Sequence, residues 1–171
     1  MIPLSEYWEL VRTGVQPAQA AGAAVLLVGF EPQPGADSEF RTRVASGRIS
    51  VPTLKTAVGA RAGVLVPLVK SSRNPYGAFI FVGRAGTNDV VFKHPSLSKS
   101  HAVFEALEGG PWHLRDNGSR NGTHLDGVRL TPNEPVDIAS GAQVTFGSFP
   151  AYFLVTPELD RLLGRARVPG R

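Results

Sequence analysis

Residues 98–123 read SKSHAVFEALEGGPWHLRDNGSRNGT, and this stretch decides the fold. It holds two apolar runs, 102–107 and 112–116, and the second alternates apolar and polar residues as a half-buried β-strand does. A segment of small polar residues lies next to each run. Ser98–His101 precede the first run, and Asn117–Thr123 follow the second. The pattern predicts short strands joined by polar loops.

The same pattern recurs along the chain, and one further apolar run ends at a third polar segment, Gly83-Arg84. Many short strands separated by turn residues are typical of an all-β sandwich. Asp126-Gly127 adds a hairpin signal. We predict strands at 25–28, 64–69, 79–82, 90–92, 102–107, 112–116, 123–125, 136–138, 143–146 and 152–155.

Short helices are predicted near both ends. Ser5 is a plausible N-cap for a helix over Leu4–Thr13, and Thr156 caps a helix over Pro157–Arg167. We therefore divide the chain into an N-terminal extension (1–62), a β-sandwich (63–156), and a C-terminal helix with a basic tail (157–171). For the N-terminal extension three roles stay open: it packs on the sandwich, docks a partner or extends the fold.

The composition narrows the class of protein. The chain has 171 residues, 42% of them apolar, which is enough for a hydrophobic core. It has no cysteine, so disulfides and thiolate metal sites are excluded. The net charge of +4 suits acidic partners such as phosphopeptides.

The longest apolar run, residues 18–30, is too short to cross a bilayer, which takes about 20 residues. We interpret it as the end of a helix followed by a strand, so no membrane insertion is expected. A cytoplasmic location is expected, and neither a cofactor nor a metal ion is.

A set of hydrogen-bond donors falls in the three polar segments. Arg84 offers a guanidinium, Ser98 a hydroxyl and Lys99 an ammonium group. Arg120 adds a second guanidinium, and Asn121 an amide. Such a set suits a dianionic phosphate, and loops on a rigid β scaffold are where binding residues collect. The donor set therefore points to a binding module and not to an enzyme.

In order and spacing, these segments resemble a forkhead-associated (FHA) domain over residues 63–156. The resemblance implies an FHA-type sandwich of about eleven strands whose loops at one end bind phosphothreonine peptides. The motifs that carry the resemblance are FVGR (81–84), NDVV (88–91), SKSHA (98–102), WHLRD (112–116), SRNGT (119–123) and VTFG (144–147).

The resemblance also implies roles for single residues. Arg84, Ser98, Lys99 and Arg120 are identified as phosphate-side residues, and Asn121 as the residue that holds the ligand backbone. Three others are expected to be architectural, shaping the loops without touching the ligand: Gly83, His101 and Gly122.

Three positions depart from the family pattern. Asp126 replaces a second asparagine near the peptide, and Ser96 stands where some members carry a basic residue that selects a ligand side chain. Ala142 replaces an acidic turn residue. The preference for residues flanking the phosphothreonine therefore stays open.

Three other functions are compatible with parts of the sequence. Ser98, His101 and Asp116 contain the residue types of a hydrolase triad, but no nucleophile-elbow motif accompanies them. Nucleic-acid binding lacks an aromatic platform or a recognition helix. A phosphate-independent scaffold for protein assembly remains the alternative to phosphothreonine recognition.

The resemblance further suggests a reader or adaptor in a bacterial Ser/Thr kinase signalling pathway. The expected partner is a phosphothreonine-containing protein or peptide, such as a Ser/Thr kinase or its substrate.

Overall fold

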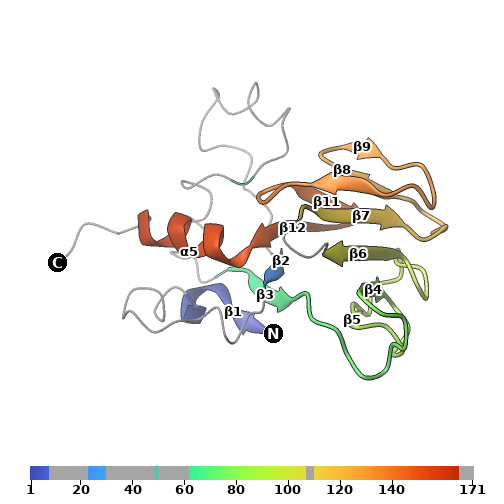
Figure 1. Ribbon diagram of the computed structural model, residues 1–171, viewed down its shortest axis with the longest axis horizontal. Coiled ribbons are helices and arrows are strands. Elements are labelled where there is room, and N and C mark those ends of the chain that lie inside the picture. Colours follow the sequence, from blue (N-terminus) through green and yellow to red (C-terminus); the bar gives the residue numbers. More distant parts are fainter. Residues whose placement is uncertain (8–22, 30–48, 50–61, 107–109, 166–171) are drawn as a thin grey trace.

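The structure, a computed structural model, describes residues 1–7, 23–29, 49, 62–106 and 110–165. Within these residues, twelve strands form two sheets that pack against each other as a β-sandwich (Figure 1). The all-β sandwich predicted from the sequence is confirmed.

The larger sheet has seven strands in the order β1-β3-β2-β12-β11-β8-β9, and all its pairings are antiparallel. Two of its strands, β1 and β2, come from segment 1–62, although the division of the chain at residue 62 stays a prediction. The strands are β1 (Ile2–Pro3), β2 (Ala24–Val28), β3 (Val64–Pro67), β8 (Thr123–Leu125), β9 (Val128–Arg129), β11 (Gln143–Phe146) and β12 (Phe149–Val155).

The smaller sheet has five strands in the order β10-β7-β6-β4-β5, and only its β4–β5 pair is parallel. Its central strands come from the segments that decided the fold. The strands are β4 (Phe79–Gly83), β5 (Val90–Val91), β6 (Ala102–Ala106), β7 (Trp112–Asp116) and β10 (Val136–Ile138).

The main core lies between the two sheets. All strands except β1 and β9 contribute to it, and those with several core residues contribute alternate ones, as the two-residue period of a strand requires. Phe104 of β6 and Phe153 of β12 stack here with their ring centroids 5.8 Å apart, which joins the sheets through aromatic contact.

A second core covers the other face of the larger sheet. Strand β2 is buried along its whole length, because Leu26 faces the main core while Val25 and Leu27 face the second one. Helix α5 (Thr156–Arg165) supplies Leu159 and Leu163 to the second core.

The two predicted end helices have different outcomes. Residues 4–7 are helical, and the rest of the helix predicted over 4–13 lies outside the described residues. The C-terminal helix is confirmed as α5, and residues 166–171 also lie outside. No helix in the described part of the chain is long and apolar enough to cross a bilayer.

Candidate functional site

Three loops meet at the end of the sandwich opposite α5 (Figure 1). The sheet register brings them together, because Val82 near the end of β4 pairs with Ala102 at the start of β6, which pairs in turn with Asp116 at the end of β7. The loops are 84–89, 92–101 and 117–122, and we call them the apical loops.

Ser98 lies at the centre of the apical loops. Its carbonyl accepts a hydrogen bond from Arg84 N at 2.9 Å, and its Oγ accepts one from Arg120 N at 2.9 Å. The hydroxyl can both accept and donate, and among the described residues its proton has no acceptor. Ser98 is therefore bonded to both neighbouring loops and still has a donor to offer.

The cationic side chains of the site are exposed. Arg84 Nε donates to the Leu97 carbonyl at 3.2 Å, which leaves the terminal nitrogens of the guanidinium available. Lys99 and Arg120 are exposed as well. None of these three has a carboxylate partner among the described residues. The site therefore carries positive charge that the fold does not neutralise.

Asn121 is exposed beside this cationic group. Its Nδ2 donates to the Ser96 carbonyl at 2.8 Å, which orients the amide. Within the described part of the chain, its Oδ1 makes no hydrogen bond. The amide therefore has one acceptor to offer an extended peptide backbone.

Two glycines shape the loops by close approach. A Cβ on Gly83 would overlap the Lys99 backbone and would lie 2.9 Å from Asn88 Nδ2. Gly122 has a φ of +79°, and a Cβ there would lie 2.7 Å from Arg129 Nε. Only glycine fits either position without displacement.

His101 is fully buried beneath the loops. Its Nδ1 accepts from Ser98 N at 3.0 Å, so the ring proton resides on Nε2, which donates to the Gly122 carbonyl at 3.2 Å. Burial lowers the pKa of His101. The neutral ring therefore ties the loop of Ser98 to the loop of Asn121.

Two further residues hold the loops and received no role from the sequence. Asn88 is buried, and its Nδ2 donates to the carbonyls of Ala85 and Lys99 at 2.8 and 2.6 Å. Asp116 is buried and accepts hydrogen bonds from Ser119 and Thr123. The sequence signal that could have identified these two residues is an Asn or Asp next to a glycine-containing turn, because such side chains form hydrogen bonds with the nearby backbone.

Burial tends to raise the pKa of Asp116, but hydrogen bonds from Ser119 and Thr123 outweigh it, and the pKa lies below its usual value. The carboxylate is therefore ionised and internally bonded.

The three departures from the family pattern have definite environments. The Asp126 carboxylate accepts from Gln143 N at 2.8 Å, and the residue has a φ of +49°. Ser96 Oγ donates to the Phe146 carbonyl at 3.1 Å. Ala142 is buried in the main core.

Ser98, His101 and Asp116 are not arranged as a hydrolase triad. His101 Nδ1 faces the backbone N–H of Ser98 and not its hydroxyl. The Asp116 carboxylate bonds Ser119 and Thr123. The ring is therefore not placed as a base for Ser98.

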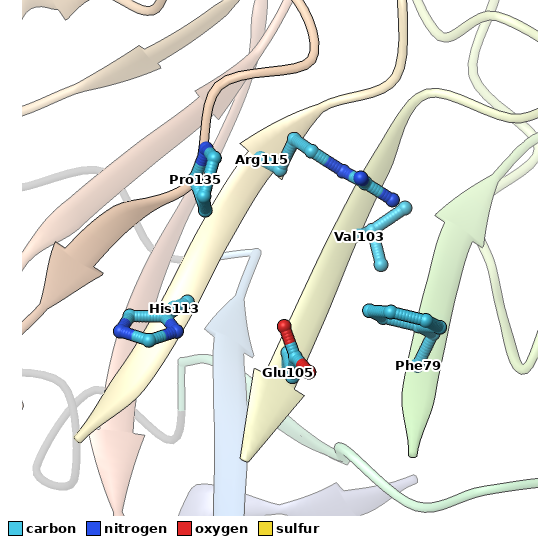
Figure 2. Close-up of a pocket in the computed structure, with 6 residues that line it drawn as sticks. All are labelled: Phe79, Val103, Glu105, His113, Arg115 and Pro135. Carbon is cyan, nitrogen blue, oxygen red and sulfur yellow. The ribbon is translucent and has the colours of Figure 1, made fainter. Parts of the chain in front are cut away.

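A shallow pocket lies on the outer face of the smaller sheet and not at the apical loops (Figure 2). The Arg115 guanidinium carbon sits 5.5 Å from the centroid of the Phe79 ring beside it. None of the predicted binding residues lines this pocket. Its walls are Phe79, Val103, Glu105, His113, Arg115 and Pro135.

Known proteins are similar to this chain in sequence. The chain is 32% identical over 111 residues to the glycogen accumulation regulator GarA of Mycolicibacterium smegmatis, an alignment that covers 60% of this chain and 66% of GarA. It is 33% identical over 95 residues to kanadaptin of Homo sapiens, covering 49% of this chain and 13% of kanadaptin. The chain thus spans less than two thirds of the length of either relative.

Among solved structures, the chain is similar to the N-terminal FHA domain of S. cerevisiae Rad53p in complex with a phosphothreonine peptide. The TM-score is 0.47 at 19% identity, over 57% of this chain and 89% of that one. Residues 80–147 match the family model described as FHA domain. This match spans the three apical loops and all five predicted binding residues, and the chain therefore carries an FHA domain.

Proposed function

We propose that this chain is a phosphothreonine-dependent peptide-binding module that acts as a reader or adaptor in Ser/Thr kinase signalling, with no catalysis of its own. Its partner is then a phosphothreonine-containing protein, such as a Ser/Thr kinase or a kinase substrate. A cytoplasmic, bacterial setting is part of the same proposal. The FHA family match and the chemistry of the apical loops support it.

The observation that carries the proposal is the hydrogen bond from Arg120 N to Ser98 Oγ. This bond uses the Ser98 oxygen as an acceptor, and no described residue accepts the hydroxyl proton. The proton can therefore be donated to a ligand oxygen. A phosphothreonine presents three acceptor oxygens and a charge of about −1.5 to −2. A neutral donor beside the unpaired cations Arg84 and Lys99 complements such a group.

Asn121 supplies the second half of the proposed recognition. Its amide is oriented by the Ser96 carbonyl, and it can bond the backbone of an extended ligand without reading side chains. Phosphate contacts would then give affinity, and Asn121 would set the register of the peptide.

The test is fluorescence anisotropy with labelled degenerate peptides carrying phosphothreonine, phosphoserine or unmodified threonine. We expect binding to the phosphothreonine peptides only. Because charge-assisted hydrogen bonds contribute about 1.5–3 kcal/mol each, Arg84→Ala should weaken binding by roughly 10- to 100-fold.

Arg161→Ala on α5 is the matched control, since this exposed arginine lies at the other end of the molecule in a surface pair with Glu158. It should leave affinity unchanged. Equal binding of phosphorylated and unmodified peptides, or unchanged binding after Arg84→Ala, would contradict the proposal.

A phosphate-independent scaffold is the second candidate function. Accessible aromatic side chains on or near the smaller sheet favour it. Phe79, in the pocket of Figure 2, is only partly buried. Tyr76, outside this pocket and in ring contact with Phe81, is 65% exposed. Such a scaffold would bind its partner equally well after Arg84→Ala and would lose affinity after Phe79→Ala.

A further inference from the structure

Arg129, at the end of the edge strand β9, lies against the apical loops. A methyl group added to Gly122 would lie 2.7 Å from Arg129 Nε and 3.1 Å from its Nη2. The guanidinium therefore covers the Cα of Gly122. Because Gly122 directly follows Asn121, this charge sits beside the residue proposed to hold the peptide backbone.

The Gly122 backbone beneath the guanidinium is fixed by hydrogen bonds on both its carbonyl and its N–H. The Gly122 carbonyl accepts hydrogen bonds from His101 Nε2 at 3.2 Å and from Gly147 N at 2.9 Å. Gly122 N donates to Ser119 Oγ at 2.9 Å. An arginine packed on this backbone presents its charge at a defined place, which lowers the entropy lost when a ligand binds.

The charge of Arg129 has no carboxylate partner in the described part of the chain. The side chain is exposed, and no carboxylate of the described residues lies within ion-pair distance of it. The Asp116 carboxylate accepts hydrogen bonds from the 117–122 loop, and the Asp126 carboxylate accepts one from Gln143 N of β11. Lys93 Nζ donates to the Arg84 carbonyl at 3.0 Å.

Arginine is suited to anionic groups that offer two oxygens. Its planar fork of N–H donors matches a carboxylate or a phosphate in a bidentate pair, and the phosphate contacts are already proposed for Arg84, Ser98 and Lys99. The residues that the structure describes supply no such carboxylate to Arg129, and the adjacent Asn121 is the residue proposed to hold a peptide backbone.

We propose that Arg129 is a specificity-determining residue that binds an aspartate or glutamate side chain of the ligand on the Asn121 side of the phosphothreonine. The inference rests on the proposed function. It names the ligand class more closely, as a phosphothreonine peptide with an acidic residue at a fixed distance from the phosphate.

The test uses phosphothreonine peptide pools in which each of the four positions on either side is fixed in turn as Glu, Gln or Lys. Anisotropy is measured with the full chain. Because a partly exposed ion pair contributes up to about 1 kcal/mol, the unaltered protein should prefer Glu over Gln by about fivefold at one position.

Arg129→Gln should abolish this preference while leaving affinity for the Gln pools within about twofold. Arg129→Glu should reverse it in favour of Lys. The charge-matched control, Arg161→Gln, should behave as the unaltered protein. Thermal unfolding checks that each variant is folded.

The inference is overturned if the unaltered protein binds Glu and Gln pools equally while still requiring phosphothreonine, which leaves the proposed function intact. It is also overturned if the preference survives Arg129→Gln, or if a folded Arg129→Gln protein loses all binding. Failure of the folded, unaltered protein to bind any phosphothreonine pool would instead remove the proposed function, and this inference with it.

Discussion

His101 links two of the apical loops through a single neutral ring. Its Nδ1 is the acceptor for Ser98 N, and its Nε2 donates to the Gly122 carbonyl. A second ring proton would lie on Nδ1 and point at the backbone N–H of Ser98, so this hydrogen bond would be lost. Because burial lowers the pKa of His101, the folded protein binds this proton less readily than the unfolded chain, whose histidines titrate near about 6.5.

This difference predicts the pH dependence of stability. Between the lowered pKa of the folded state and about 6.5, the unfolded chain binds more protons, so stability rises with pH. We therefore expect the free energy of unfolding to fall as the pH is lowered from about 7.5 to 5.5. Urea denaturation at several pH values measures it.

The attribution to this residue has its own check. His101→Gln should have a flatter pH profile over the same range. An unchanged slope in His101→Gln would assign the effect to other groups.

At the scale of elements, the 117–122 loop owes its shape to one carboxylate. Asp116, the last residue of β7, accepts from Ser119 N at 2.9 Å, Ser119 Oγ at 2.6 Å and Thr123 Oγ1 at 2.7 Å. Ser119 Oγ in turn accepts from Gly122 N. The Asp116 carboxylate and the Ser119 hydroxyl therefore hold the backbone that carries Arg120 and Asn121 in place.

Asp116→Asn should destabilise the fold by about 1–3 kcal/mol, because the amide replaces one acceptor oxygen with a donor. Either Ser119 N–H or the hydroxyls of Ser119 and Thr123 then lose their acceptor. Peptide affinity should fall as well, since the loop loses its support. Asp137→Asn is the matched control: its carboxylate is exposed and should change stability by less than about 0.5 kcal/mol. Equal effects in both variants would show that the Asp116 network is dispensable.

At the scale of the whole molecule, the second core joins the two ends of the chain. Leu4 and Tyr7 from the N-terminus pack with Leu159 and Leu163 of α5 against the larger sheet. Tyr7 Oη donates to Asp160 Oδ1 at 2.8 Å. This core lies on the face of the sheet away from the smaller sheet and does not include the apical loops.

This arrangement predicts that a substitution in the second core lowers the stability of the fold without changing peptide affinity at the apical loops. Leu159→Ala should cost about 2–5 kcal/mol, since the side chain is fully buried and a cavity would remain. Peptide affinity of the folded fraction should stay unchanged, because the apical loops are held by other contacts. Urea denaturation and anisotropy measure the two quantities.

Leu162→Ala on the same helix is the control. Leu162 is only partly buried, so its loss of stability should be smaller. A drop in affinity that parallels the loss of stability in Leu159→Ala would contradict this separation.

Much of the fold was predictable because its signals are local. Alternating and continuous apolar runs placed the strands, and Asp126-Gly127 placed the β8–β9 hairpin, since turn chemistry depends on neighbouring residues. The candidate site was predictable for the same reason: its residues form short motifs next to strands. Their role as phosphate ligands stays a prediction.

The sequence by itself determined the class of fold, ten of the twelve strands that the structure describes, and the residues that gather at the apical loops, because each depends on the pattern of a few neighbouring positions. Only the tertiary structure decided that β2 lies between β3 and β12, that Asp116 and His101 hold the loops, and that Arg129 covers Gly122. These contacts join residues distant in sequence or depend on side-chain direction. Sheet register and packing set them, and no local pattern encodes either.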